Sequence, residues 1–263
     1  MHPCVILASI ILYTQYVYTH ISLPLKVRSY TTISTSNDTV QLYNCYSTDM
    51  SIPVSFSHEP DNVYHLIFDT GSATLGVVSN TCSINISDPY NCALASPTYT
   101  QQPSLGTVDA YYGIGSFSGI INIDNVSVGS MQVTDLSFAV ITSNNGFFVN
   151  GDCNGNYNVP ANSQGIIGFA YESLALPNTD SWLHEYVQQH NIPNVFSIVV
   201  PDSQVYIGGY KYPVSNLRNI TIDQSQWYIQ QQLINQFYTV SLNDILIGDT
   251  SVGITQIVYS VAQ

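Results

Sequence analysis

A single carboxylate, that of Asp69, stands between two apolar stretches of the chain. Leu66–Phe68 comes directly before it, and apolar residues resume at 75–78. Because Leu, Ile, Val and Phe favour a buried, pleated surface, the sequence predicts two strands joined by a turn that carries one acid. A carboxylate in such a place can act as a general base or acid, provided that hydrogen bonds stabilise its ionised form.

The turn after Asp69 contains groups that could hold this carboxylate. Thr70 and Ser72 carry hydroxyls, and Gly71 can adopt backbone angles that other residues avoid. The backbone N–H groups of the turn are further donors. The simpler alternative is an ordinary hairpin turn with a solvated Asp69.

The composition favours a β-rich globular protein and argues against nucleic-acid binding. The chain is 45 % apolar, contains 20 Tyr, and has 17 acidic against 4 basic residues, for a net charge of −13. With so few bases, we expect no basic patch for nucleic acid or an anionic membrane. The length suits one large domain or two small ones.

The N-terminal residues predict a secretory signal over 1–20. The apolar run Val5–Tyr13 is too short to span a bilayer comfortably, so we expect no membrane contact once the signal is removed; an anchor or a buried strand is the alternative. An even number of cysteines then remains, which favours disulfides over zinc. Four N-x-S/T sequons are expected glycosylation sites: Asn37, Asn85, Asn125 and Asn219.

A second motif combines glycines with an aromatic residue. Tyr112-Gly113-x-Gly115-Ser116 is followed by Gly119, an apolar run and Asp124. Glycines at this spacing allow a tight hairpin turn whose tip can bend over a cleft. On its own this pattern also fits any β-hairpin.

Taken in chain order, these motifs resemble the pepsin-like aspartic peptidases. The first active-site loop of that family is similar to residues 66–77, its flap hairpin to residues 108–126, and its Gly-Ile-Leu-Gly segment to Gly165–Tyr171. The resemblance implies a mostly β, bilobal fold. We expect a short pro- or linker segment at 21–42, a complete N-terminal lobe at 43–172 and a partial C-terminal lobe at 173–263.

The resemblance also implies a chemistry: hydrolysis of peptide bonds by a water molecule that two carboxylates activate while sharing one proton. Asp69 would be the catalytic carboxylate, and Thr70, Gly71 and Ser72 would support its loop. The flap residues over the polypeptide substrate would be Tyr112, Gly113, Gly115 and Ser116. No metal or cofactor is expected, and the protein would be a monomer that is secreted or delivered to a lysosome or vacuole.

The resemblance further implies a disulfide between Cys82 and Cys92, where the family often has one. This would leave Cys45 and Cys153 as a second pair.

Three positions depart from the family pattern. Gly76 replaces a Trp that normally braces the flap tyrosine, Gln164 replaces an Asp, and Tyr259 stands in the slot of the second catalytic Asp. A phenol, with a pKa of about 10, does not titrate usefully in that role.

Three interpretations therefore stay open: an aspartic endopeptidase that is weak or inactive, a non-catalytic peptide-binding relative, and a truncated gene product. Pairing of two chains that each contribute Asp69 is a less favoured route to a carboxylate pair.

Overall fold

The computed structural model describes residues 7–9, 38–45, 49–82, 97–113, 115–145, 163–199, 204–209, 237–242, 244, 246–247, 249–251 and 257–260. Within these ranges the chain is mostly β-strand, as the sequence predicts. Its strands are β1 (Leu7–Ser9), β2 (Thr39–Gln41), β3 (Tyr43–Cys45), β4 (Asp49–Phe56), β5 (Glu59–Asp69), β6 (Leu75–Val78), β7 (Thr107–Tyr112), β8 (Gly115–Val128), β9 (Met131–Asn145), β10 (Gly165–Gly168), β11 (Phe196–Val199), β12 (Gln204–Ile207), β13 (Thr239–Leu242), β14 (Leu246–Ile247), β15 (Thr250–Ser251) and β16 (Ile257–Ser260). The helices are a short 3₁₀ helix (Glu172–Leu174) and α1 (Trp182–His190).

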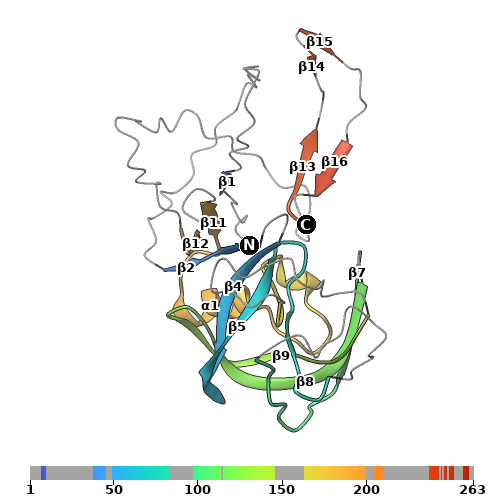
Figure 1. The fold of residues 1–263 in the computed structure, drawn as a ribbon. Coiled ribbons are helices and arrows are strands. Elements are labelled where there is room, and N and C mark those ends of the chain that lie inside the picture. Colours follow the sequence, from blue (N-terminus) through green and yellow to red (C-terminus); the bar gives the residue numbers. More distant parts are fainter. Residues whose placement is uncertain are drawn as a thin grey trace.

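The main sheet has the strand order β3-β4-β5-β10-β6-β9-β8-β7. Strand β4 also pairs with the far end of β8, with Val54 opposite Val128, so the sheet curls back on itself. In Figure 1 the long strands β8 and β9 curve beneath β4 and β5. The inner face of this curled sheet is apolar: Val54, Leu66 and Val128 are fully buried.

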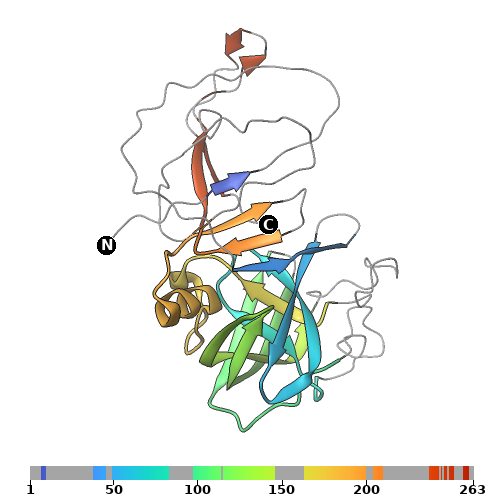
Figure 2. The same cartoon turned by 90° about the vertical axis from the view of Figure 1, so that its left-hand side faces the viewer.

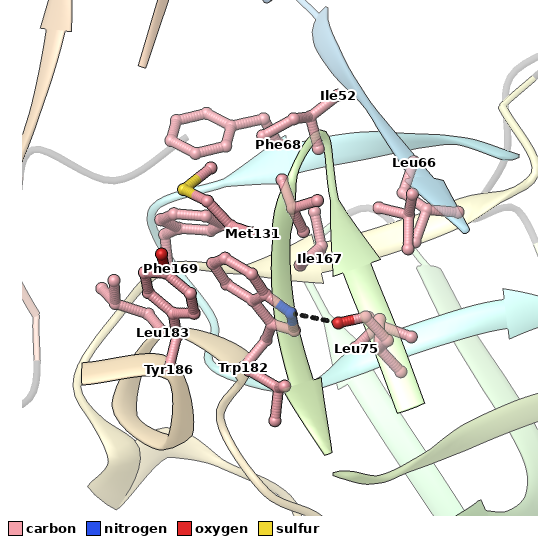
Figure 3. Close-up of a cluster of buried hydrophobic side chains, with 14 of the residues drawn as sticks. Ile52, Leu66, Phe68, Leu75, Met131, Ile167, Phe169, Trp182, Leu183 and Tyr186 are labelled. Atoms are coloured by element: carbon pink, nitrogen blue, oxygen red, sulfur yellow. Dashed lines mark hydrogen bonds between the residues drawn. The ribbon is translucent and has the colours of Figure 1, made fainter. Parts of the chain in front are cut away.

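Helix α1 covers the sheet and closes the core. Ser181 begins it as N-cap, where its hydroxyl accepts a hydrogen bond from the backbone N–H of His184. Trp182 is fully buried, donates its indole N–H to the carbonyl of Val126 at 3.1 Å and stacks on Tyr186 with ring centroids 5.1 Å apart. Figure 3 shows Trp182 and Tyr186 beside Phe169 within the apolar cluster. The helical spacing of apolar residues over 181–187 predicts a short helix, and α1 confirms it.

Smaller sheets complete the described part of the chain. One has the order β1-β11-β12-β2, and the pairs β13–β16 and β14–β15 stand separately. Figure 2 shows β11 and β12 next to β2, above the main sheet. Phe196 and Val205, from β11 and β12, share one apolar cluster with the main sheet. The lobe boundaries remain a prediction.

Two local expectations have different outcomes. The polar run of residues 57–62 predicts a turn, but only Ser57 and His58 form one. Strand β5 already begins at Glu59, because the backbone there pairs with β4, with Phe56 opposite Glu59. Cys82 is disulfide-bonded, and because Cys92 lies outside the described residues, the pairing of Cys82 with Cys92 stays a prediction. The sites Asn37, Asn85, Asn219, Cys92 and Cys153 lie outside the described residues.

Gly168 occupies a position where no side chain fits. A Cβ placed there would lie 2.4 Å from the carbonyl oxygen of Ser72 and 2.5 Å from the Cα of Ala73, both backbone atoms that a rotamer change cannot move. The end of β10 therefore packs backbone against backbone with the segment after Asp69.

We expect Gly168→Ala to lower the free energy of unfolding by about 3 kcal/mol, because the added methyl group forces apart two packed backbones. Urea unfolding monitored by circular dichroism measures this. Gly113→Ala is the matched control, since a Cβ at Gly113 meets nothing within 4 Å, and its effect should stay within about 0.5 kcal/mol. Equal stability of the two variants would contradict the packing described here.

Candidate active site

The segment that carries Asp69 is not a hairpin, because β5 and β6 do not pair with each other. Strand β10 lies between them, parallel to β5 with Gly168 opposite Asp69 and antiparallel to β6 with Gly165 opposite Val77. The connection between β5 and β6, called here the Asp69 loop (residues 69–74), therefore passes over the end of β10. The alternative of an ordinary hairpin turn is wrong.

Hydrogen bonds from the end of β10 hold the Asp69 loop. The N–H of Phe169 donates to the carbonyl of Asp69 at 2.7 Å, that of Ala170 to Ser72 at 2.8 Å, and that of Gly168 to Thr74 at 3.1 Å. Three bonds within one short segment leave the loop backbone little freedom. The position of the carboxylate is thus set by a strand that is distant in sequence.

The Asp69 carboxylate is buried and bonded on both oxygens. Its residue is 7 % exposed, its Oδ1 accepts the N–H of Gly71 at 2.7 Å, and its Oδ2 accepts the hydroxyl of Ser72 at 2.5 Å. Burial raises the pKa of the Asp69 carboxyl above its usual value, and the hydrogen bonds from Ser72 and Gly71 oppose that rise. Thr70 is partly buried in the same loop.

The predicted flap is a hairpin of β7 and β8, paired up to Tyr112 opposite Gly115. Gly113 follows β7 at the tip of the hairpin, and residue 114 lies outside the described residues. The Tyr112 side chain is hydrogen-bonded to Ser72. Burial, together with the negative charge of Asp69, raises the pKa of Tyr112 to about 12.

A cavity of about 450 Å³ separates the Asp69 loop from the flap. The sequence-predicted residues that line it are Asp69, Gly71, Ser72, Tyr112 and Gly113. Gly115 and Ser116 begin the returning strand β8, and the described lining does not include them.

The remaining lining residues were not predicted: Thr74, Ala110, Tyr111, Leu174, Leu176 and Phe237. Thr74 connects two of the segments involved, since its hydroxyl accepts the N–H of Leu176 at 2.7 Å and lies 3.1 Å from that of Thr179. Leu174 and Leu176 come shortly after the segment Gly165–Tyr171 that resembles the family's, and this proximity was the available signal. Nothing local to Phe237 indicates that it reaches this cavity.

Gln164, which departs from the family pattern, is a structural residue of the main sheet. It is fully buried, and its side-chain carbonyl accepts the N–H of His65 at 2.6 Å. Its backbone carbonyl accepts from Val78 at 2.8 Å, so one residue joins β5 to β6. A neutral amide can make these contacts at any pH, because it carries no charge to desolvate.

Tyr259 lies in β16, opposite Val240 of β13. Its side chain is outside what the structure describes, so the relation of this residue to Asp69 stays a prediction. Among the described residues, no three His, Cys, Asp or Glu side chains come together in the way a metal site needs.

Comparison with known proteins agrees with this arrangement. The family model for eukaryotic aspartyl protease matches residues 52–261, so the chain belongs to the pepsin-like aspartic peptidase family. It is 27 % identical over 183 residues to embryonic pepsinogen of Gallus gallus, which covers 66 % of this chain and 45 % of that protein. It is 32 % identical over 122 residues to cathepsin D of Dictyostelium discoideum, covering 44 % and 29 %. Gastricsin of Homo sapiens is 26 % identical over 202 residues, covering 76 % and 49 %. The chain thus spans about half the length, or less, of these relatives.

The raised pKa of Asp69 has a consequence for stability. In the interval between the unfolded-state pKa and the higher folded-state pKa, the folded protein binds more protons, so stability falls as pH rises through that interval. We expect the unfolding free energy of the parent, minus that of Asp69→Asn, to be largest below about pH 3.8 and to fall as pH rises through the folded-state pKa. Urea unfolding of both proteins across the acidic range measures this difference. Parallel curves would show that burial does not shift this group.

Ser72→Ala should raise the pKa of Asp69 further, because the variant loses a hydroxyl that stabilises the ionised carboxylate. Titration of the carboxyl carbon by ¹³C NMR in aspartate-labelled protein follows this directly. Ser118→Ala is the control, since that hydroxyl donates at 2.6 Å to a different carboxylate, that of Asp109. The prediction is wrong if the two variants give the same Asp69 titration.

Proposed function

We propose that this chain is an aspartic-type endopeptidase by descent, with Asp69 as its surviving catalytic carboxylate and polypeptide as its substrate. One observation carries the proposal. The buried carboxylate of Asp69 accepts a hydrogen bond on each oxygen and lines a cavity that Tyr112 of the flap hairpin also lines. Family membership supports the same reaction class.

In the proposed reaction, ionised Asp69 accepts a proton from the attacking water. Gly71 and Ser72 donate to the carboxylate and keep it oriented while it does so. Tyr112 covers the site and limits the access of bulk water, which strengthens the electrostatic interactions inside. Thr70 supports the loop, and Gly113, Gly115 and Ser116 shape the flap turn.

The reaction also needs an acid that polarises the peptide carbonyl, and Tyr259 stands in the sequence slot of that acid. A phenol there would donate a hydrogen bond without sharing a titrating proton with Asp69. We therefore expect hydrolysis to be slow or absent. The second candidate function is a peptide-binding protein that keeps the cavity and does not cleave its ligand, and the Tyr259 substitution favours it.

The setting of this function follows from the same proposal. The chain would enter the secretory pathway and act as a monomer, outside the cell or in a lysosome or vacuole. Cys82–Cys92 would be a disulfide, and Asn125, which is partly exposed in β8, would be a glycosylation site. The helices of the described residues include none with the length and apolarity to cross a membrane.

An assay on denatured protein substrate tests the proposal. It is run at about pH 3 to 5, the range in which the paired carboxyls of aspartic peptidases share one proton. On the endopeptidase proposal, the parent cleaves slowly but above the background that Asp69→Asn sets, because that variant loses the base. Asp109→Asn, a matched change of an acid on the flap strand β7, should cleave like the parent.

If the parent cleaves no faster than Asp69→Asn, the enzyme interpretation is wrong. Retention of the same protein on an immobilised statine-type inhibitor would then support the peptide-binding function, and no retention would reject both functions.

A further inference from the structure

Gly76 leaves a space inside the main sheet that two other side chains fill. It lies in β6 between Ile166 of β10 and Ala139 of β9, and it is buried. A Cβ at this position would lie 3.3 Å from Cζ of Phe117 and 3.3 Å from Cδ1 of Ile141. The tip of the Phe117 ring therefore rests where a side chain at position 76 would begin.

Phe117 also contacts the flap tyrosine. It is 2 % exposed, and its ring centroid lies 6.0 Å from that of Tyr112 with an angle of 31° between the planes, a normal distance for an aromatic pair. In the hairpin register, Tyr112 faces Gly115, and Phe117 faces Ala110. The residue directly opposite Tyr112 thus has no side chain, and the aromatic contact comes from the diagonal position.

Tyr111 and Tyr112 are neighbours in the chain but differ in burial, and it is Tyr112 that contacts Phe117. Tyr111 lies on the opposite face of β7 and is 85 % exposed, although it stands next to Tyr112 at the same hairpin tip. Tyr112 is partly buried and packs against the apolar cluster that contains Phe117 and Ile141. A side chain at a hairpin tip keeps one orientation only if packing offsets its lost rotamer freedom.

We propose that Phe117 is a positioning residue: seated in the space that Gly76 leaves, it holds the Tyr112 ring over Asp69. Hydrogen bonds then connect the flap to the Asp69 loop: Tyr112 is bonded to the side chain of Ser72, and the Ser72 hydroxyl donates to Asp69. Gly76 matters because a Cβ there would lie 3.3 Å from both Phe117 and Ile141, so one of these side chains would have to shift. This inference rests on the proposed function in that the ring it positions closes the proposed substrate cavity.

The orientation of Tyr112 can be measured without any activity. With 3-fluorotyrosine placed at position 112, the parent should give one ¹⁹F resonance with a small solvent isotope shift in D₂O. Phe117→Leu should move or broaden that resonance, increase the isotope shift and weaken binding of a statine-type inhibitor about tenfold, because the ring loses its support.

Phe138→Leu is the matched control. Phe138 is fully buried in β9, and its ring packs on Phe56 at 5.0 Å within the other apolar cluster. This variant loses the same ring from the same sheet, so it should lower thermal stability while leaving the Tyr112 resonance and inhibitor binding unchanged. Equal effects of the two variants on the resonance would overturn the proposal.

Gly76→Ala gives a second test that keeps both rings and protects the experiment if Phe117→Leu does not fold. It should perturb the Tyr112 resonance in the same direction, and the double variant should be no more perturbed than Phe117→Leu alone, because both changes act through one contact. An unperturbed resonance in Gly76→Ala would overturn the role of Gly76. If the parent binds no inhibitor, the proposed function fails, and the resonance still decides the role of Phe117.

Discussion

The insertion of β10 between β5 and β6 is the constraint on which the site depends. Its last residue, Gly168, lies so close to Ser72 and Ala73 that a single methyl group would not fit. This approach allows three backbone hydrogen bonds between residues 168–170 and the Asp69 loop. The loop backbone is therefore supported like part of a sheet, although it has no strand partner of its own.

A fixed loop makes it possible to bury an acid in a defined orientation. Burial disfavours the ionised carboxylate of Asp69, and hydrogen bonds from Gly71 and Ser72 recover part of that cost because the loop places both donors within bonding distance. The same Ser72 side chain is hydrogen-bonded to Tyr112, so it connects the flap to the loop. Desolvation of the acid and closure of the cavity are thus two results of one arrangement.

The flap shows how packing inside the sheet extends to the mouth of the cavity. A glycine in β6 makes room for Phe117, whose ring faces the interior on one side and Tyr112 on the other. In the family pattern, a Trp usually stands at the position of Gly76 and braces the flap tyrosine. Here the volume comes from the flap strand itself, so the support and the supported ring lie on the same hairpin.

Much of this protein could be predicted from its sequence because the signals are local. The apolar run before Asp69, the glycine turn beside Tyr112 and the helix that follows Ser181 each depend on residues within one element. Those signals were sufficient for a mostly β fold, for the acid and for the hairpin over it. They could not distinguish a hairpin from two strands separated by a third, because pairing partners distant in sequence leave no mark in a local pattern.

The tertiary structure alone decided the surroundings of the acid. Whether Asp69 is solvated or buried depends on β10, which follows about a hundred residues later in the chain and approaches only because Gly168 has no side chain. Phe237 also lines the cavity because chain folding, and not sequence proximity, brings it there. The sequence by itself determined which groups could do chemistry. Long-range backbone packing determined how deeply these groups are buried and which donors and neighbours surround them.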